Sequence, residues 1–116
     1  MREKIRAFLG VASKAEAGWT EILILLMPLF EQLIQQLIER CTNTEDQAVE
    51  MFTEPTPLQA RLMHRELVQQ MRRDGRIPIR ERNACAWQVV NDAVEAANAN
   101  PAMVAEMFRE VKSPAA

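Results

Sequence analysis

Residues 19–41, WTEILILLMPLFEQLIQQLIERC, decide the fold class because they hold the longest helical pattern in the chain. In the second half of this stretch, apolar residues recur every three to four positions and polar residues fill the opposite side. That pattern is typical of an amphipathic helix. We therefore predict one long helix from about Trp19 to Cys41, bent at Pro28, which lacks a backbone donor. Its apolar side is expected to be Phe30, Leu33, Ile34, Leu37 and Ile38.

The first half of this long helix is apolar on the side where the second half is polar. When the polar stripe is followed backwards in steps of three and four residues, it passes through Pro28, Leu25 and Ile24. A contiguous exposed apolar surface usually marks an interaction site. Three kinds of contact could bury this apolar surface. They are another helix of the same chain, a protein partner such as a symmetric second copy, or an apolar ligand or membrane surface.

Start and stop signals define two further helices. Thr44 and Thr56 are each followed three residues later by glutamine, which is the pattern of a capping box. Pro57 then takes the first helical position after Thr56. These signals predict helices over about residues 45–53 and 57–74, the second ended by Gly75 in a left-handed conformation.

Apolar spacing indicates three more helices, over about residues 2–15, 81–99 and 101–111. The apolar side of the 81–99 helix is expected to be Trp87, Val90, Ala93, Val94 and Ala97. Pro78 predicts an extended connector over residues 76–80, with Ile77 and Ile79 both turned toward the core. Residues 112–116 are expected to form a loose tail.

The expected architecture is all-α, since no alternating strand pattern competes with these helices. We predict a compact irregular or orthogonal bundle of about six helices. A chain of 116 residues with 48% hydrophobic and 26% charged residues is typical of one globular domain, here residues 1–116.

Residue types that carry catalysis or bind metals are sparse. The chain has one histidine, His64, and two cysteines, Cys41 and Cys85, without CxxC spacing. His64 borders an apolar stripe and is expected to be structural or exposed. Cys85 is expected to be a small buried residue, although positive charge from Arg80 or Arg82 could instead lower its pKa. We predict no catalytic residue, no cofactor and no metal site, and therefore a protein that is not an enzyme.

The cysteines and the apolar stretches together indicate the compartment. Two distant cysteines in a chain of this size are expected to stay reduced. The longest uncharged stretch, Ile22 to Phe30, is too short to span a bilayer, and the start of the chain does not fit a signal peptide. We expect a cytoplasmic protein without a transmembrane segment.

Basic residues concentrate in one segment. Residues 61–82 hold seven arginines and three acidic residues, a net charge of +4, in a chain whose net charge is −2. Guanidinium groups suit phosphate and carboxylate, so this ridge predicts either a nucleic-acid contact or ion pairs with acidic neighbours or a second subunit. The ridge is Arg61, Arg65 and Arg72 on one side of the 57–74 helix, followed by Arg73, Arg76 and Arg80.

Two functional hypotheses follow from these surfaces. The leading one is a non-enzymatic helical interaction domain that self-associates, as a homodimer, through Ile24, Leu25 and Pro28. The alternative is a nucleic-acid-associated regulatory protein that uses the basic ridge from Arg61 to Arg82.

Overall fold

The computed structural model describes the backbone of residues 19–112 and the side chains of residues 27–112. This part of the chain contains five α-helices and no strand, so the all-α class is confirmed. The expected helix over residues 2–15 lies outside the described residues, so a sixth helix is not confirmed. Lys112, expected in the loose tail, is instead the last residue of a helix, and the rest of that tail, residues 113–116, lies outside the described residues. The five helices are α2 (Trp19–Cys41), α3 (Glu45–Thr53), α4 (Pro57–Asp74), α5 (Ile79–Ala99) and α6 (Pro101–Lys112).

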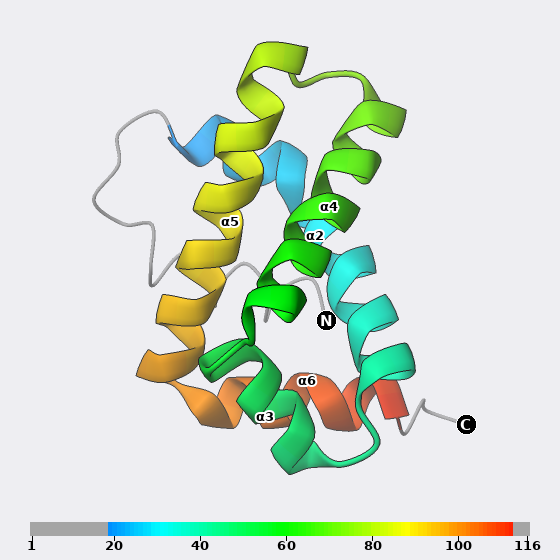
Figure 1. Ribbon diagram of the computed structural model, residues 1–116, viewed down its shortest axis with the longest axis vertical. Helices are drawn as coiled ribbons and strands as arrows, with labels where there is room; N and C mark the ends of the chain where they lie inside the picture. The colour runs from blue at the N-terminus through cyan, green and yellow to red at the C-terminus, as the bar shows by residue number, and fades with distance from the viewer. Residues whose placement is uncertain (1–18, 113–116) are drawn as a thin grey trace.

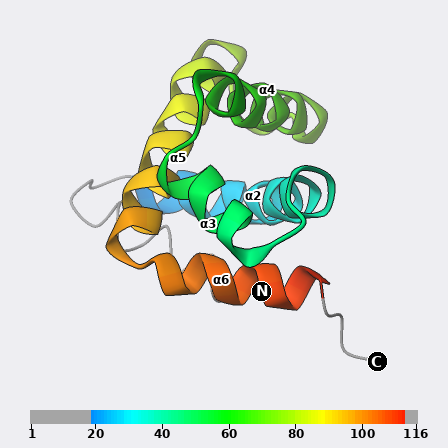
Figure 2. The ribbon, with the colours of Figure 1, turned by 60° about the horizontal axis from the view of Figure 1, so that its bottom comes forward.

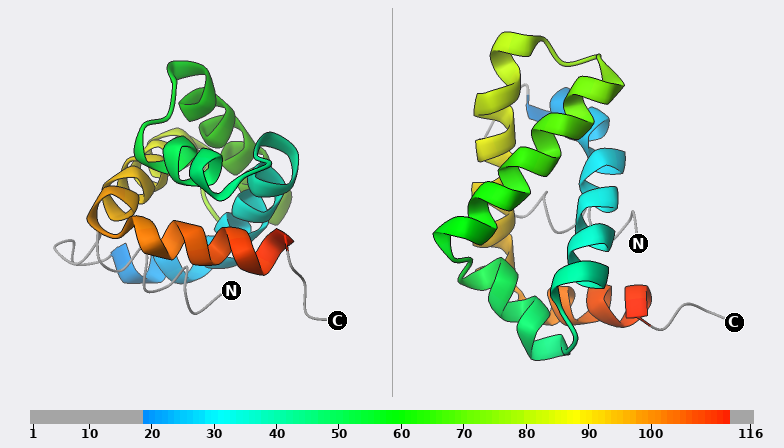
Figure 3. Two further views of the ribbon diagram at one scale, coloured as in Figure 1. Left: turned by 90° about the horizontal axis from the view of Figure 1, so that it is seen from below. Right: turned by 45° about the vertical axis from the view of Figure 1, so that its right-hand side comes forward.

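The helices form a compact body in which α4 packs along α5 and α3 packs along α6 (Figure 1). α2 contacts both α4 and α6, and Figure 2 shows it between them. α6 runs across the end of the molecule where α3 also lies, as the right-hand view of Figure 3 shows. The predicted compact arrangement is confirmed, whereas an orthogonal one is not.

Local capping chemistry sets the helix bounds. The Thr44 and Thr56 hydroxyls accept hydrogen bonds from the backbone N–H groups of Gln47 and Gln59, at 3.2 and 3.1 Å. Each glutamine side chain accepts a bond from its threonine N–H in return, which completes both predicted capping boxes. α4 ends at Gly75, whose φ of 78° is left-handed and whose N–H donates to the Met71 carbonyl.

The connector between α4 and α5 is shorter than predicted. α5 already begins at Ile79, because Pro78 precedes it with a φ of −56° and its carbonyl accepts from the Glu81 N–H. The expectation that both isoleucines face the core is wrong for one of them. Ile77 is buried, whereas the side chain of Ile79 is 79% exposed.

The core is built from residues of all five described helices. The predicted apolar side of the second half of α2 is confirmed, since all five of its residues are buried. The predicted apolar side of α5 is confirmed in part, since Val90, Ala93 and Ala97 are buried. Trp87 and Val94 instead lie half-buried at its border, and Ala86, Val89 and Ala96 are buried in addition. The inner side of α4 contributes Met63, Leu67 and Met71, each at most 1% exposed.

Candidate functional site

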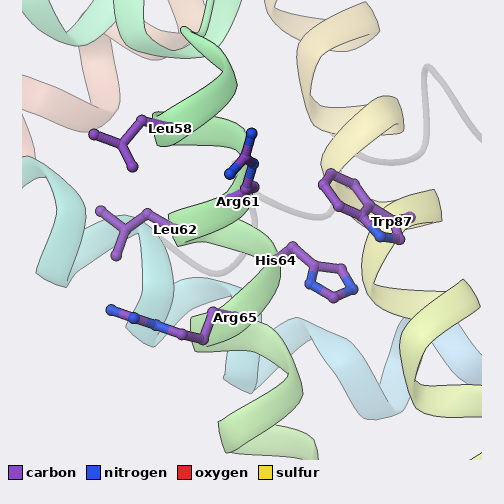
Figure 4. Close-up of a pocket in the computed structure, with 6 residues that line it drawn as sticks. All are labelled: Leu58, Arg61, Leu62, His64, Arg65 and Trp87. Atoms are coloured by element: carbon purple, nitrogen blue, oxygen red, sulfur yellow. The ribbon is translucent and has the colours of Figure 1, made fainter.

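The outer side of α4 carries an open hollow of about 630 Å³ that extends to α5 (Figure 4). Its volume falls within the range of about 300–1,000 Å³ that is typical of ligand pockets. We call it the α4 hollow, and it is lined by Leu58, Arg61, Leu62, His64, Arg65 and Trp87. Five of these residues belong to the first half of α4, and Trp87 comes from α5.

The start of α4 holds these side chains in place. Thr56 caps the helix and Pro57 occupies its first turn, so the helical register is set just before Leu58. In that register Leu58 and Leu62 lie one turn apart, as do Arg61 and Arg65. The leucine pair lies about 60° around the helix from the arginine pair at 100° per residue. Apolar and cationic side chains are therefore neighbours over two turns.

The hollow is bounded on the α5 side by an aromatic stack. The rings of His64 and Trp87 lie 4.3 Å apart between centroids and 20° from parallel, and Figure 4 shows His64 reaching across to the tryptophan. The Nε2 atom of His64 is buried, and no group in the described part of the chain hydrogen-bonds to it. The prediction that His64 is structural is supported in one respect, because its ring joins α4 to α5.

Two leucines give the hollow its apolar character. Leu58 is 75% exposed and Leu62 is half-buried. Figure 4 shows both pointing to the side of α4 opposite His64. Leu58 and Ile79 are the exposed large hydrophobic residues of the described chain, so the hollow holds one of two such positions.

Two arginines flank these leucines and have no ion-pair partner in the described part of the chain. Arg61 and Arg65 are both exposed. No carboxylate among the described residues forms an ion pair with either one. The predicted internal pairing of these two arginines is therefore not found between residues 27 and 112.

The rest of the predicted ridge divides into paired and unpaired groups. Arg76 forms a two-point ion pair with Asp74, at 2.7 and 2.8 Å, and the hydrogen bond holds the pKa of Asp74 below its usual range. Arg72, Arg73 and Arg80 are exposed and have no ion pair within the described part. The seven arginines of the segment therefore do not form one uniform surface.

The apolar surface predicted on α2 is described only in part. Ile24 and Leu25 lie in α2, but their side chains are outside the described residues. Pro28 is half-buried, and its neighbours Met27 and Leu29 are buried within the chain. The apolar surface formed by Ile24, Leu25 and Pro28 therefore stays a prediction.

Cys85 lacks the features of a reactive thiol. Both cysteines are free, with Cys41 exposed and Cys85 buried. Burial, and secondarily the nearby charge of Glu81, raises the pKa of Cys85. The direction of the pKa shift is opposite to the alternative in which Arg80 or Arg82 lowers it, because burial of the thiol outweighs any effect of the arginines.

Two other features, a metal-binding cluster and a membrane-spanning helix, are absent from the described residues. No three histidine, cysteine or acidic side chains between residues 27 and 112 gather closely enough to bind a metal ion. None of the five helices has the length and apolar content that a membrane span requires.

Sequence reasoning found the arginines of the hollow but not the hollow itself. Leu58 and Leu62 lie off the buried stripe of α4, and their spacing repeats that of Arg61 and Arg65. This shared spacing was the sequence signal that could have predicted an apolar surface beside the arginines. The contribution of Trp87 depends on how α5 packs against α4, which local patterns do not contain.

Comparison of the chain with protein-family models, with curated proteins and with solved structures found no match, so the interpretation of the α4 hollow rests on its own geometry.

Proposed function

We propose that this protein is a non-enzymatic interaction domain that binds another polypeptide in the α4 hollow. The observation that carries the proposal is the exposed Leu58 side chain beside two exposed arginines that have no ion pair among residues 27–112. Protein interfaces are enriched in arginine and aromatic residues, and their strongest contacts lie where apolar anchors fill pockets. Trp87, Arg61 and Leu58 supply these residue types within one hollow.

A polypeptide suits the hollow better than a nucleic acid does. Proteins that grip a nucleic-acid backbone present cations along its path and often stack bases on aromatic rings. In the hollow the arginines stand beside leucines, and the Trp87 ring already stacks on His64. Nucleic-acid binding remains a second candidate for the far end of α4, because Arg72, Arg73 and Arg80 are exposed there without ion pairs in the described part.

Self-association through Ile24, Leu25 and Pro28 and a cytoplasmic location remain predictions. The solution mass across a range of protein concentrations tests the first of them. A stable mass near twice 13.3 kDa that is lost on Ile24→Glu plus Leu25→Lys would support the homodimer. A monomer at all concentrations would exclude it.

Site-directed photo-cross-linking in the native host cells tests the proposed function. A photoreactive phenylalanine analogue replaces Leu58 in the hollow, and in a control chain it replaces Asn91, an exposed residue of α5 outside the hollow. We expect a polypeptide, identified by mass spectrometry, to cross-link from position 58 only. The adduct should be lost when Arg61→Glu and Arg65→Glu are added.

Each other outcome contradicts the proposal. Equal adducts from positions 58 and 91, or adducts that survive both arginine reversals, would show contact without a specific site. A nuclease-sensitive adduct would assign the face to nucleic acid. No adduct from position 58 would remove the hollow as a binding surface.

A further inference from the structure

We propose that the segment bound in the α4 hollow is an acidic amphipathic helix of a different protein. This inference rests on the proposed function and names the chemistry and the shape of the partner. Its carboxylates would pair with Arg61 and Arg65, and its apolar side chains would pack on Leu58, Leu62 and Trp87.

Charge identifies the partner as acidic. Arg61 and Arg65 are exposed and have no ion pair among residues 27–112, so a carboxylate of the partner would not have to replace one from that part of the chain. Paired arginines one turn apart match two carboxylates that are also one turn apart on a facing helix. Arginine is the cation best suited to such two-point contacts.

The same charge argument disfavours two occupants from the chain itself. Residues 1–18 contain four basic and two acidic residues, a net charge of +2 that would meet like charges in the hollow. A second copy could offer Leu58 or Ile79 as an exposed apolar anchor from its described residues. Arg61 flanks the first and Arg80 the second, so either contact would bring arginines together.

Spacing alone does not separate a helix from an extended peptide. Four residues of helix rise by about 6 Å, and two residues of strand rise by about 6.6 Å. Both repeats match side chains that lie one turn apart on α4. The backbone of the partner decides between them.

An extended peptide must hydrogen-bond its own backbone to something. Peptides that bind as strands normally add to the edge of a sheet, and the described part of this chain contains no strand. Desolvating peptide groups against leucine side chains without such partners is unfavourable. A helix satisfies its backbone internally, so it can lie against Leu58 and Leu62 without that penalty.

Two display libraries test the inference. Both libraries fix two leucines and two glutamates and vary the other positions. In the helical library the residues of each pair are four positions apart, and in the extended library they are two positions apart. Selection uses the full chain, and the Arg61→Glu/Arg65→Glu variant removes peptides that bind elsewhere. We expect hollow-dependent binders from the helical library only, and a proline placed inside such a peptide should weaken binding about tenfold or more.

A charge swap makes the test specific for the ion pairs. Lysine in place of both glutamates should abolish binding to the natural chain and restore binding to the Arg61→Glu/Arg65→Glu variant. The matched control is Arg72→Glu/Arg73→Glu, which carries the same charge change outside the hollow and should leave the affinity within about twofold.

The outcomes separate this inference from the proposed function. Equal enrichment from both libraries, or binders that tolerate proline, would overturn the helix while hollow-dependent peptide binding would stand. Failure of the charge swap would overturn the acidic pairing. If neither library yields a hollow-dependent binder, the helix is overturned, and the cross-link from position 58 decides independently whether the hollow binds another polypeptide.

Discussion

The two sides of α4 differ sharply in how far their apolar side chains are exposed. On the inner side, Met63, Leu67 and Met71 are almost completely buried against the core. On the outer side, Leu58 is 75% exposed beside Arg61 and Arg65. Leucine therefore serves stability on one side of the helix and remains available for contact on the other. The difference shows that apolar residues of a single helix can differ completely in their contribution to the core, which leaves Leu58 free for the contact proposed above.

Replacing one leucine on each side should give the largest contrast in stability. Leu67→Ala leaves a cavity in the core and should lower the free energy of unfolding by about 2–5 kcal/mol. Leu58→Ala removes the same atoms from an exposed position and should change it by less than about 0.5 kcal/mol. Urea unfolding followed by circular dichroism measures both. Equal losses would contradict the division of α4 into a folding side and a contact side.

Removing the cap of α4 should have an intermediate effect. Thr56→Ala deletes the hydroxyl that accepts from the Gln59 N–H and should cost about 1 kcal/mol. The same change at Thr44, which caps α3, serves as the matched comparison. Amide hydrogen exchange should rise most in the first turn of α4 for Thr56→Ala. Exchange that is unchanged around Leu58 would show that the cap does not hold the hollow in register.

Reversing arginines at the two ends of α4 should give a smaller contrast. Arg72 and Arg73 lie in the last turn, where the helix dipole favours positive charge, so Arg72→Glu/Arg73→Glu should destabilise the fold by about 1 kcal/mol. Arg61→Glu/Arg65→Glu should change stability by less than about 0.5 kcal/mol, because neither arginine has a described ion-pair partner. Thermal unfolding distinguishes the two variants. A larger loss for the Arg61/Arg65 pair would mean that these arginines support the fold.

The smallest expected effect concerns acid and the Asp74–Arg76 pair. Because hydrogen bonding to Arg76 lowers the pKa of Asp74, the contribution of this pair is complete near neutral pH. It is lost as the pH falls through the lowered pKa and the carboxylate gains a proton. A carboxyl-detected NMR titration should show the pKa of Asp74 rising toward its ordinary value in Arg76→Gln. An unchanged pKa would show that the pair does not persist in solution.

Helix bounds were the most predictable part of this fold. Capping boxes and the left-handed Gly75 depend on residues within one turn of each other, so a linear pattern contains all the information they need. The prediction failed at Ile79, because a proline before a helix fits either a connector or a helix start.

The hollow was less predictable because it depends on contacts between helices. The sequence placed Arg61 and Arg65 on one side of a helix, and the structure agrees. It assigned Trp87 to the buried side of α5, whereas the ring lies at the border and stacks on His64. The rotation of α5 about its axis is set by packing against α4, and a rotation of part of a turn moves a residue from core to surface.

The side-by-side placement of arginines and leucines has a kinetic consequence. Exposed charges act over about 10 Å at moderate ionic strength and mainly change how often partners meet. Apolar contacts act only at touching distance and mainly change how long partners stay together. Added salt should therefore slow the capture of an acidic partner through Arg61 and Arg65, whereas trimming Leu58 should shorten the lifetime of the complex. The arginine pair would then set the association rate and the leucine pair the dissociation rate, although both pairs lie on adjoining turns of one helix.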